Sequence, residues 1–140
     1  MTLSLITGGA GFIGSNLADE LLKMGHKVTV VDNEYSDAHD QFYWNKDTYN
    51  VNCDIRDYKT LKNCMHDVDY VFHFAAEARI QPAIKNPIEA VSINSLGTCT
   101  VLQCAREAGV KKVMYSSTSA GYGLNSCLLY TSDAADDQLG

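Results

Sequence analysis

A glycine-rich turn near the N-terminus carries the clearest chemical signal in the sequence. Gly8, Gly11 and Gly14 follow the apolar residues 3–6 at the spacing G-x-x-G-x-x-G. At these positions a side chain would block a tight turn, the approach of a pyrophosphate, or the packing of a helix on a strand. A helix that begins at Phe12 would direct its free N-terminal amides and its positive dipole end at the phosphates. The turn therefore predicts a dinucleotide-binding site.

A carboxylate follows the next apolar segment. Residues 27–31 have the composition of a strand, and Asp32 comes directly after them. Its carboxylate can accept hydrogen bonds from both hydroxyls of an adenosine ribose, whereas a 2′-phosphate would be repelled and no arginine follows to bind it. The alternative is a chance acidic residue beside a glycine-rich turn. The order strand, glycines, helix, strand and acid favours a cofactor-binding site, and Asp32 favours NAD over NADP as the cofactor.

Short apolar segments alternate with segments of helical periodicity along the whole chain. The expected strands are residues 3–7, 27–31, 49–52, 70–74 and 112–116, and the expected helices are residues 12–24, 58–65 and 87–108. Gly25 and Gly109 are placed to end the first and the last of these helices. This alternation predicts an α/β fold with a parallel sheet wrapped by helices. The polar and aromatic loop 33–48 has few packing signals and could touch a ligand.

Length and composition restrict the class of protein. The 140 residues, 46% of them hydrophobic, are enough for one globular unit. The net charge of −6 and the scattered basic residues argue against nucleic-acid binding. No apolar run approaches the roughly 18 residues of a membrane span and no secretory leader is recognisable, so we expect a cytoplasmic protein. The five cysteines form no C-x-x-C pair, and no metal site is predicted.

Further motifs add to the glycine turn. They are Asp32-Asn33, Asp54-Ile55-Arg56-Asp57, His73-Phe74-Ala75-Ala76, Asn94-Ser95-Leu96-Gly97-Thr98, and Ser116-Ser117-Thr118 followed by Tyr122-Gly123. Together they resemble the N-terminal half of extended short-chain dehydrogenase/reductases of the NAD-dependent epimerase/dehydratase family, which act on nucleotide sugars. The resemblance covers roughly residues 1–125 and implies a Rossmann-type doubly wound parallel sheet.

The resemblance also implies which residues bind the cofactor NAD. They are Gly8, Gly11, Phe12, Ile13, Gly14, Asp32, Asn33, Asp54, Ile55, Phe74, Ala75, Ala76, Asn94 and Ser116. Asp54 would bond the exocyclic amine of adenine while Ile55 covers one face of the ring, although Asp54 could instead cap the following helix. The amide of Asn94 would hold backbone groups near the nicotinamide half, with a solvent-facing side chain as the alternative. The segment from Phe74 to Ala76 would line the path of the cofactor, or be only a strand end with small packing residues.

Thr118 is the residue that the resemblance implies in the chemistry. Its hydroxyl would bond the reacting oxygen of the sugar, and Ser116 would bond near the nicotinamide. A hydroxyl can polarise a substrate, but it cannot remove a proton at neutral pH without a base. The family's base is the tyrosine of a Tyr-x-x-x-Lys pair further along the chain. Here no lysine follows Lys112, and Tyr122 belongs to the serine and threonine motif.

Three other polar residues need an interpretation. His73 lies in a buried strand pattern, which favours a structural role over proton transfer. Glu77 and Arg79 follow the alanines at the expected substrate-facing mouth, where they could orient a sugar or its phosphates. Pairing with a neighbouring loop in solvent is the alternative.

The resemblance ends abruptly at Ser126. Residues 127–137 match, in order, a translation of the transposase end sequence used in tagmentation libraries. We therefore expect residues 1–125 to be a truncated NAD-binding Rossmann domain without its C-terminal substrate part. Residues 126–140 would be a non-native tail translated from a sequencing adapter, and the fragment would be inactive alone.

The family resemblance implies an enzyme of nucleotide-sugar metabolism. The favoured reaction is that of a UDP-glucose 4-epimerase, in which a hydride passes from the sugar ring to bound NAD and back. A 4,6-dehydratase or decarboxylase of the family, an NAD(P)H-dependent reductase and a non-catalytic NAD-binding module remain alternatives. Ser119-Ala120 stand where a dehydratase would have Asp-Glu, which argues modestly for the epimerase. A homodimer is expected by analogy with the family.

Overall fold

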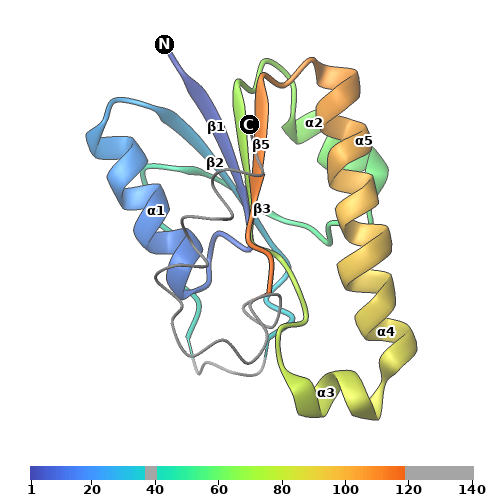
Figure 1. Ribbon diagram of the computed structural model, residues 1–140. Helices are drawn as coiled ribbons and strands as arrows, with labels where there is room; N and C mark the ends of the chain where they lie inside the picture. Colours follow the sequence, from blue (N-terminus) through green and yellow to red (C-terminus); the bar gives the residue numbers. More distant parts are fainter. Residues whose placement is uncertain (37–40, 119–140) are drawn as a thin grey trace, which may run out of the picture.

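The computed structural model describes residues 1–36 and 41–118 (Figure 1). Within these residues, five parallel strands form one sheet in the order β3-β2-β1-β4-β5. The strands are β1 (Leu3–Thr7), β2 (Lys27–Asp32), β3 (Tyr49–Asn52), β4 (Tyr70–His73) and β5 (Lys112–Tyr115). The chain proceeds outward from β1 to β3 and then returns to β4 on the other side of β1. Such a reversal leaves a crevice at the carboxyl ends of the central strands, which is where open α/β sheets bind ligands.

Helices cover both faces of the sheet. They are α1 (Phe12–Lys23), α2 (Tyr58–Cys64), α3 (Ile80–Lys85), α4 (Pro87–Val91), the π-helix η1 (Ser92–Gly97) and α5 (Thr98–Ala108). Figure 1 shows α1 on one side of the sheet and α2, α4 and α5 on the other. This is the Rossmann-type doubly wound arrangement that the sequence predicts.

The two cores follow from the alternation of side chains along β1. Leu5 packs in the cluster that includes Leu61 of α2 and Val101 of α5. Ile6, the next residue, packs in the opposite cluster with Leu21 of α1. Successive side chains of a strand point to opposite faces of its sheet. The central strand β1 is therefore buried on both faces, from Ser4 to Thr7.

The predicted element boundaries agree closely with the structure. Each predicted strand begins at its predicted residue, and none of the strand ends differs by more than one residue. Gly25 and Gly109 follow α1 and α5 with φ of +83° and +70°, the left-handed conformation expected of a glycine after a helix. The starts of the strands and the glycines that follow α1 and α5 therefore lie where the sequence predicts them.

Two helical features depart from the prediction. Residues 87–108 are helical throughout, and the consecutive elements α4, η1 and α5 are called the long helix below. Within it, a π-helical segment replaces the α-helix at Ser92–Gly97. The short helix α3 was not predicted; it has only six residues, and none of them is buried. Its Pro82 is in the first turn, where proline is tolerated.

Some predictions lie outside the described residues. These are the domain boundary at residue 125, the tail 126–140 and Tyr122. Within the described part of the chain, no helix is long and apolar enough to cross a membrane.

Candidate nucleotide-binding site

A cleft of about 370 Å³ lies beside the glycine turn and the carboxyl ends of the strands. Its lining contains every predicted cofactor residue except Asn94 and Ser116, namely Gly8, Gly11, Phe12, Ile13, Gly14, Asp32, Asn33, Asp54, Ile55, Phe74, Ala75 and Ala76. The structure thus gathers residues from four separate chain segments at one place. The cleft also contains Tyr35 and Phe42 from the loop that was expected to touch a ligand.

Steric contacts explain why the turn contains glycines. A Cβ on Gly8, whose φ is +67°, would lie 2.8 Å from the backbone nitrogen of Ala75. A Cβ on Gly14 would lie 2.3 Å from the carbonyl oxygen of Gly8. Gly11 is the N-cap of α1, and no side chain in the described residues caps that helix. The turn therefore brings the uncapped N-terminus of α1 to the cleft, where it can bind an anion.

Gly9 is a requirement that the motif spacing did not reveal. A Cβ there would lie 2.7 Å from Cγ1 of Val30, on the neighbouring strand β2. The backbone nitrogens of Gly8 and Gly9 both donate to the carbonyl of Val31, at 2.8 and 3.3 Å. The turn is therefore packed directly against β2, and only tertiary contacts show this.

The carboxylate of Asp32 faces the same turn. Its Oδ2 accepts a hydrogen bond from the backbone nitrogen of Ala10 at 3.1 Å, and its Oδ1 accepts one from Glu34 at 2.8 Å. An ionised carboxylate offers about four acceptor positions. Asp32 is therefore fixed in orientation and still has capacity for the hydroxyls of a ligand.

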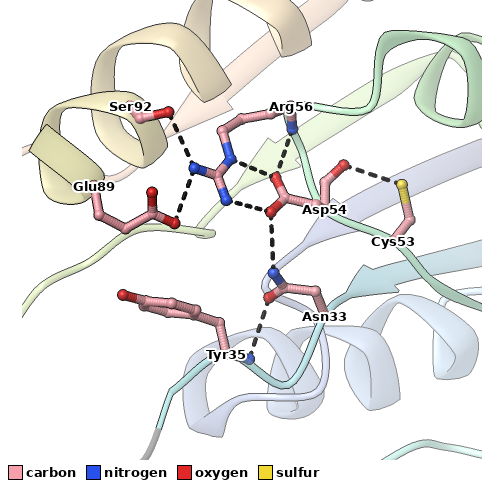
Figure 2. A network of polar contacts seen from close by, with 7 residues as sticks. All are labelled: Asn33, Tyr35, Cys53, Asp54, Arg56, Glu89 and Ser92. Carbon is pink, nitrogen blue, oxygen red and sulfur yellow. Dashed lines mark hydrogen bonds and ion pairs between the residues drawn. The ribbon is translucent and has the colours of Figure 1, made fainter.

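Asp54 is not the cap of the following helix. That role belongs to Asp57, whose side chain accepts from the backbone nitrogen of Thr60 at 3.2 Å. Asp54 instead lies at the cleft beside Asn33, whose Nδ2 is 3.4 Å from its Oδ2 (Figure 2). Hydrogen bonds from Arg56 hold the pKa of the Asp54 carboxyl below its usual range, so it is ionised at neutral pH.

Glu77 is more enclosed than its sequence position suggests. Its side chain is only 4% exposed, and its Oε1 accepts from the backbone nitrogen of Arg79 at 3.0 Å. Its buried Oε2 has no hydrogen-bond partner among the residues that the structure describes. Buried acceptors are normally satisfied, so this oxygen needs a donor from water or a ligand. Glu77 and Arg79 both line the cleft, which favours the ligand-orienting interpretation over solvent pairing.

Asn94 acts on the backbone and does not line the cleft. From the π-helix, its Oδ1 accepts from the backbone nitrogen of Glu77 at 2.9 Å, and its Nδ2 donates to the carbonyl of Glu77 at 3.0 Å. A single side chain therefore satisfies both backbone groups of Glu77. This contact ties the loop after β4 to the long helix.

Ser116 and Thr118 follow β5 and are exposed. The backbone nitrogen of Ser116 donates to the carbonyl of His73 at 3.3 Å, which fixes the start of this segment beside β4. Neither residue lines the cleft.

His73 joins three elements. Its Nδ1 is 2.6 Å from Oγ1 of Thr7 on β1, and its Nε2 is 2.9 Å from Oγ1 of Thr98 on α5. Burial lowers the pKa of this histidine, so the neutral ring is favoured. With both nitrogens engaged inside the fold, His73 has the structural role that its sequence pattern favours.

Arg56 is the residue of the site that the sequence interpretation missed. It belongs to the motif Asp54-Ile55-Arg56-Asp57, whose sequence does not reveal the contacts of the arginine with the long helix. Its guanidinium bonds Asp54, Glu89 and Ser92, as Figure 2 shows. The only signal in the sequence was a cation two residues after a cofactor-binding acid.

Comparison with known proteins gives consistent matches. The family model described as "NAD dependent epimerase/dehydratase family" matches residues 4–137. The UDP-N-acetyl-alpha-D-glucosaminuronate decarboxylase of Bacillus cytotoxicus is 43% identical over 122 residues, which cover 85% of this chain and 37% of that protein. The UDP-glucose 4-epimerase of Halalkalibacterium halodurans is 40% identical over 121 residues, covering 85% of this chain and 35% of that protein.

Solved structures match at the level of the whole described fold. The UDP-glucose 4-epimerase of Thermotoga maritima with UDP-glucose has a TM-score of 0.80 and 34% identity, with 90% of this chain and 41% of that chain covered. The Thermus thermophilus UDP-glucose 4-epimerase complex with NAD has a TM-score of 0.75 and 31% identity, with 84% of this chain and 38% of that chain covered. The chain thus spans only about two fifths of the length of the relatives that it matches.

Proposed function

Because the chain belongs to the NAD-dependent epimerase/dehydratase family, we propose that it is the NAD-binding part of a UDP-glucose 4-epimerase-like enzyme. The observation that carries the proposal is the cleft at the carboxyl ends of β1 and β4. There, three glycines of the turn have no room for a Cβ, and they leave the backbone at the N-terminus of α1 open to a pyrophosphate. NAD is the cofactor of the family, and a structural relative was solved in complex with it.

The residues around the cleft fit each part of NAD. The glycine turn and α1 would hold the pyrophosphate, and Asp32 would accept from the hydroxyls of the adenosine ribose. Asp54 and Ile55 would receive the adenine, while Ala75 and Ala76 leave room for the rest of the dinucleotide. When bound, NAD supplies a hydride acceptor for the sugar ring.

The groups that act on the sugar are proposed from the same family pattern. Thr118 would bond the reacting oxygen, and Ser116 would bond near the nicotinamide. Glu77, whose buried Oε2 has no partner within residues 1–36 and 41–118, would accept a hydrogen bond from a ligand donor. Proton removal needs a base in addition to these groups, because a hydroxyl is a poor base at neutral pH.

A decarboxylase is the second candidate function. It is favoured by the 43% identity to the decarboxylase of Bacillus cytotoxicus. We rank the epimerase first because the solved relatives that match most of this chain include several 4-epimerases.

Calorimetric titration of the full chain with NAD and NADP tests the cofactor assignment. We expect NAD to bind at least about tenfold more tightly, because a 2′-phosphate would face Asp32. In the variant Asp32→Ser this preference should narrow. Failure of the wild-type chain to bind NAD would contradict the proposed function.

Incubation of the NAD-loaded product of the intact gene with candidate substrates separates the two reactions, because residues 1–140 alone are expected to be inactive. Formation of UDP-galactose from UDP-glucose supports the epimerase. Release of carbon dioxide from UDP-N-acetyl-alpha-D-glucosaminuronate supports the decarboxylase. The products can be identified by NMR.

We also propose that the protein forms a homodimer through the long helix. Along residues 87–108, Ile88 is 82% exposed and Val91 is 61% exposed, and Leu96 and Leu102 are exposed as well. A contiguous set of exposed apolar side chains is typical of a protein interface. A second copy of the chain is the occupant that the family resemblance suggests.

A further inference from the structure

Arg56 lies between the adenine end of the cleft and the long helix. Its Nε and Nη2 donate to the two oxygens of Asp54, at 2.9 and 2.6 Å, in a two-pronged pairing. Its Nη1 is 2.9 Å from Oε1 of Glu89 on α4 and 3.0 Å from Oγ of Ser92 on η1. Figure 2 shows this guanidinium between the two acids, with Asn33 on the opposite side of Asp54.

Burial makes these contacts stronger than an ordinary surface pair. The side chains of Arg56, Asp54 and Glu89 are 24%, 32% and 31% exposed. Single exposed ion pairs contribute little because the side chains are free to move and the charges are screened. Here the fork geometry of arginine fixes the carboxylate in one plane, which a lysine could not do.

The acceptor positions of Asp54 are almost filled. Its Oδ1 accepts from the backbone nitrogen of Arg56 at 2.8 Å as well as from Nε, and its Oδ2 accepts from Nη2. The fourth contact, from Asn33 to Oδ2, is long at 3.4 Å. Since a carboxylate offers about four acceptor positions, the position near Asn33 is the one that a ligand donor can take.

We propose that Arg56 is a positioning residue for recognition of the adenine base. It turns Asp54 so that the weakly occupied position of Oδ2 is presented to the exocyclic amine, and Glu89 and Ser92 anchor it to the long helix. Discrimination between bases at the cleft therefore depends on a contact from α4, which does not itself line the cleft. This inference rests on the proposed NAD-binding function.

Comparison of NAD with deamino-NAD tests the inference. In deamino-NAD a carbonyl oxygen replaces the exocyclic amine of adenine. This oxygen cannot donate a hydrogen bond to the Asp54 carboxylate. The wild-type chain should prefer NAD. In Arg56→Met the preference, measured by calorimetric titration of both dinucleotides, should shrink about tenfold, the loss expected for one charge-assisted hydrogen bond.

Two further variants make the result specific. Arg56→Lys keeps the positive charge but not the forked pairing with Asp54, so it should also lose most of the preference for NAD over deamino-NAD. It serves as the test variant if Arg56→Met does not fold. Lys62→Met is the matched control, because Lys62 pairs with Glu107 between α2 and α5, at 2.7 Å, and does not line the cleft. It should retain the wild-type preference. Thermal melting without cofactor measures any general loss of stability, which would weaken both dinucleotides equally.

The possible outcomes are distinguishable. If the arginine variants keep the wild-type ratio of affinities, the inference is wrong. A wild-type chain that binds both dinucleotides equally also overturns it, while the proposed NAD-binding function stands. A wild-type chain that binds neither dinucleotide removes the proposed function and this inference together.

Discussion

An alanine at position 14 would place its Cβ 2.3 Å from the carbonyl oxygen of Gly8 and 2.6 Å from Cα of Gly9. Both neighbours are backbone atoms, so they cannot turn away as the end of a side chain can. Gly109 provides a contrast, because a Cβ there would have nothing within 4 Å although its φ is +70°. At the scale of the single residue, the two glycines are needed for different reasons, one for space and the other for backbone conformation.

This contrast gives a matched pair of variants. Gly14→Ala should lower the free energy of unfolding by about 2 kcal/mol and raise the dissociation constant of NAD at least about tenfold, because the turn must shift. Gly109→Ala should cost about 1 kcal/mol for the left-handed conformation and leave NAD affinity unchanged. Chemical denaturation and calorimetric titration measure the two effects. Unchanged NAD binding by Gly14→Ala would show that the turn does not hold the pyrophosphate.

His73 should make stability depend on pH in one direction. Because burial lowers the pKa of His73 below 6.5, the unfolded chain takes up a proton that the folded chain resists. The neutral ring of His73 therefore makes its full contribution to the free energy of unfolding above pH 6.5. This contribution is lost as the pH falls through the pKa of His73 in the folded state.

Denaturation of His73→Gln at pH 7.5 and 5.5 measures this contribution. The drop in the free energy of unfolding between the two pH values should be smaller in His73→Gln than in the wild type. The control His66→Gln removes an exposed histidine beside Asp67 and should show the wild-type drop. Equal drops in all three proteins would contradict the buried neutral state of His73.

At the scale of the element, the π-helical segment brings the long helix into contact with the lining of the cleft at Ile55. Its last residue, Gly97, is buried against Ile55, and a Cβ there would lie 2.4 Å from Cδ1 of that side chain. Asn94 in the same segment holds the backbone of Glu77, and Ser92 holds Arg56. One irregular turn therefore contacts two parts of the cleft lining.

A double-mutant cycle tests the contact between these elements. Gly97→Ala should destabilise the wild-type protein by about 1 to 2 kcal/mol, because the added methyl group displaces Ile55. In an Ile55→Ala background the space is free, so the same substitution should cost at least about 1 kcal/mol less. Additive effects in chemical denaturation would show that the two residues are not in contact.

At the scale of the whole molecule, the two faces of the sheet differ in what they expose. Figure 1 shows α1 on the side opposite to the long helix. The long helix exposes Ile88 and Val91. On the side of α1, the exposed apolar residues are Phe12 and Ile13, which line the cleft, and Met24 after the end of the helix. The proposed dimer would use only the side of the long helix.

The dimer proposal predicts an asymmetric response to added charge. Val91→Glu should convert the protein to a monomer in sedimentation velocity, because a charge would be buried in the interface. Met24→Glu adds the same charge on the other side and should leave the assembly unchanged. A wild-type chain that sediments as a monomer at micromolar concentration would rule the dimer out.

The domain division at residue 125 stays a prediction. Sequencing of the source DNA beyond codon 125 should reveal a different sequence in place of residues 126–140. This sequence should contain a Tyr-x-x-x-Lys pair. If the same tail is found in genomic DNA, the adapter interpretation is wrong.

The local structure of the chain and the glycines of the turn could be predicted from the residues alone. Strand starts, helix ends at Gly25 and Gly109, and the requirement for Gly8 and Gly14 follow from periodicity and backbone sterics within a few residues. Only the tertiary structure decided the π-helical segment, the contact of Asn94 with Glu77, and the joining of Asp54 to Glu89 through Arg56. The contact of Asn94 with Glu77 links residues 17 positions apart, and that of Arg56 with Ser92 links residues 36 positions apart. Local propensity carries no information about such pairs, because their geometry depends on how the sheet places one loop beside a distant helix.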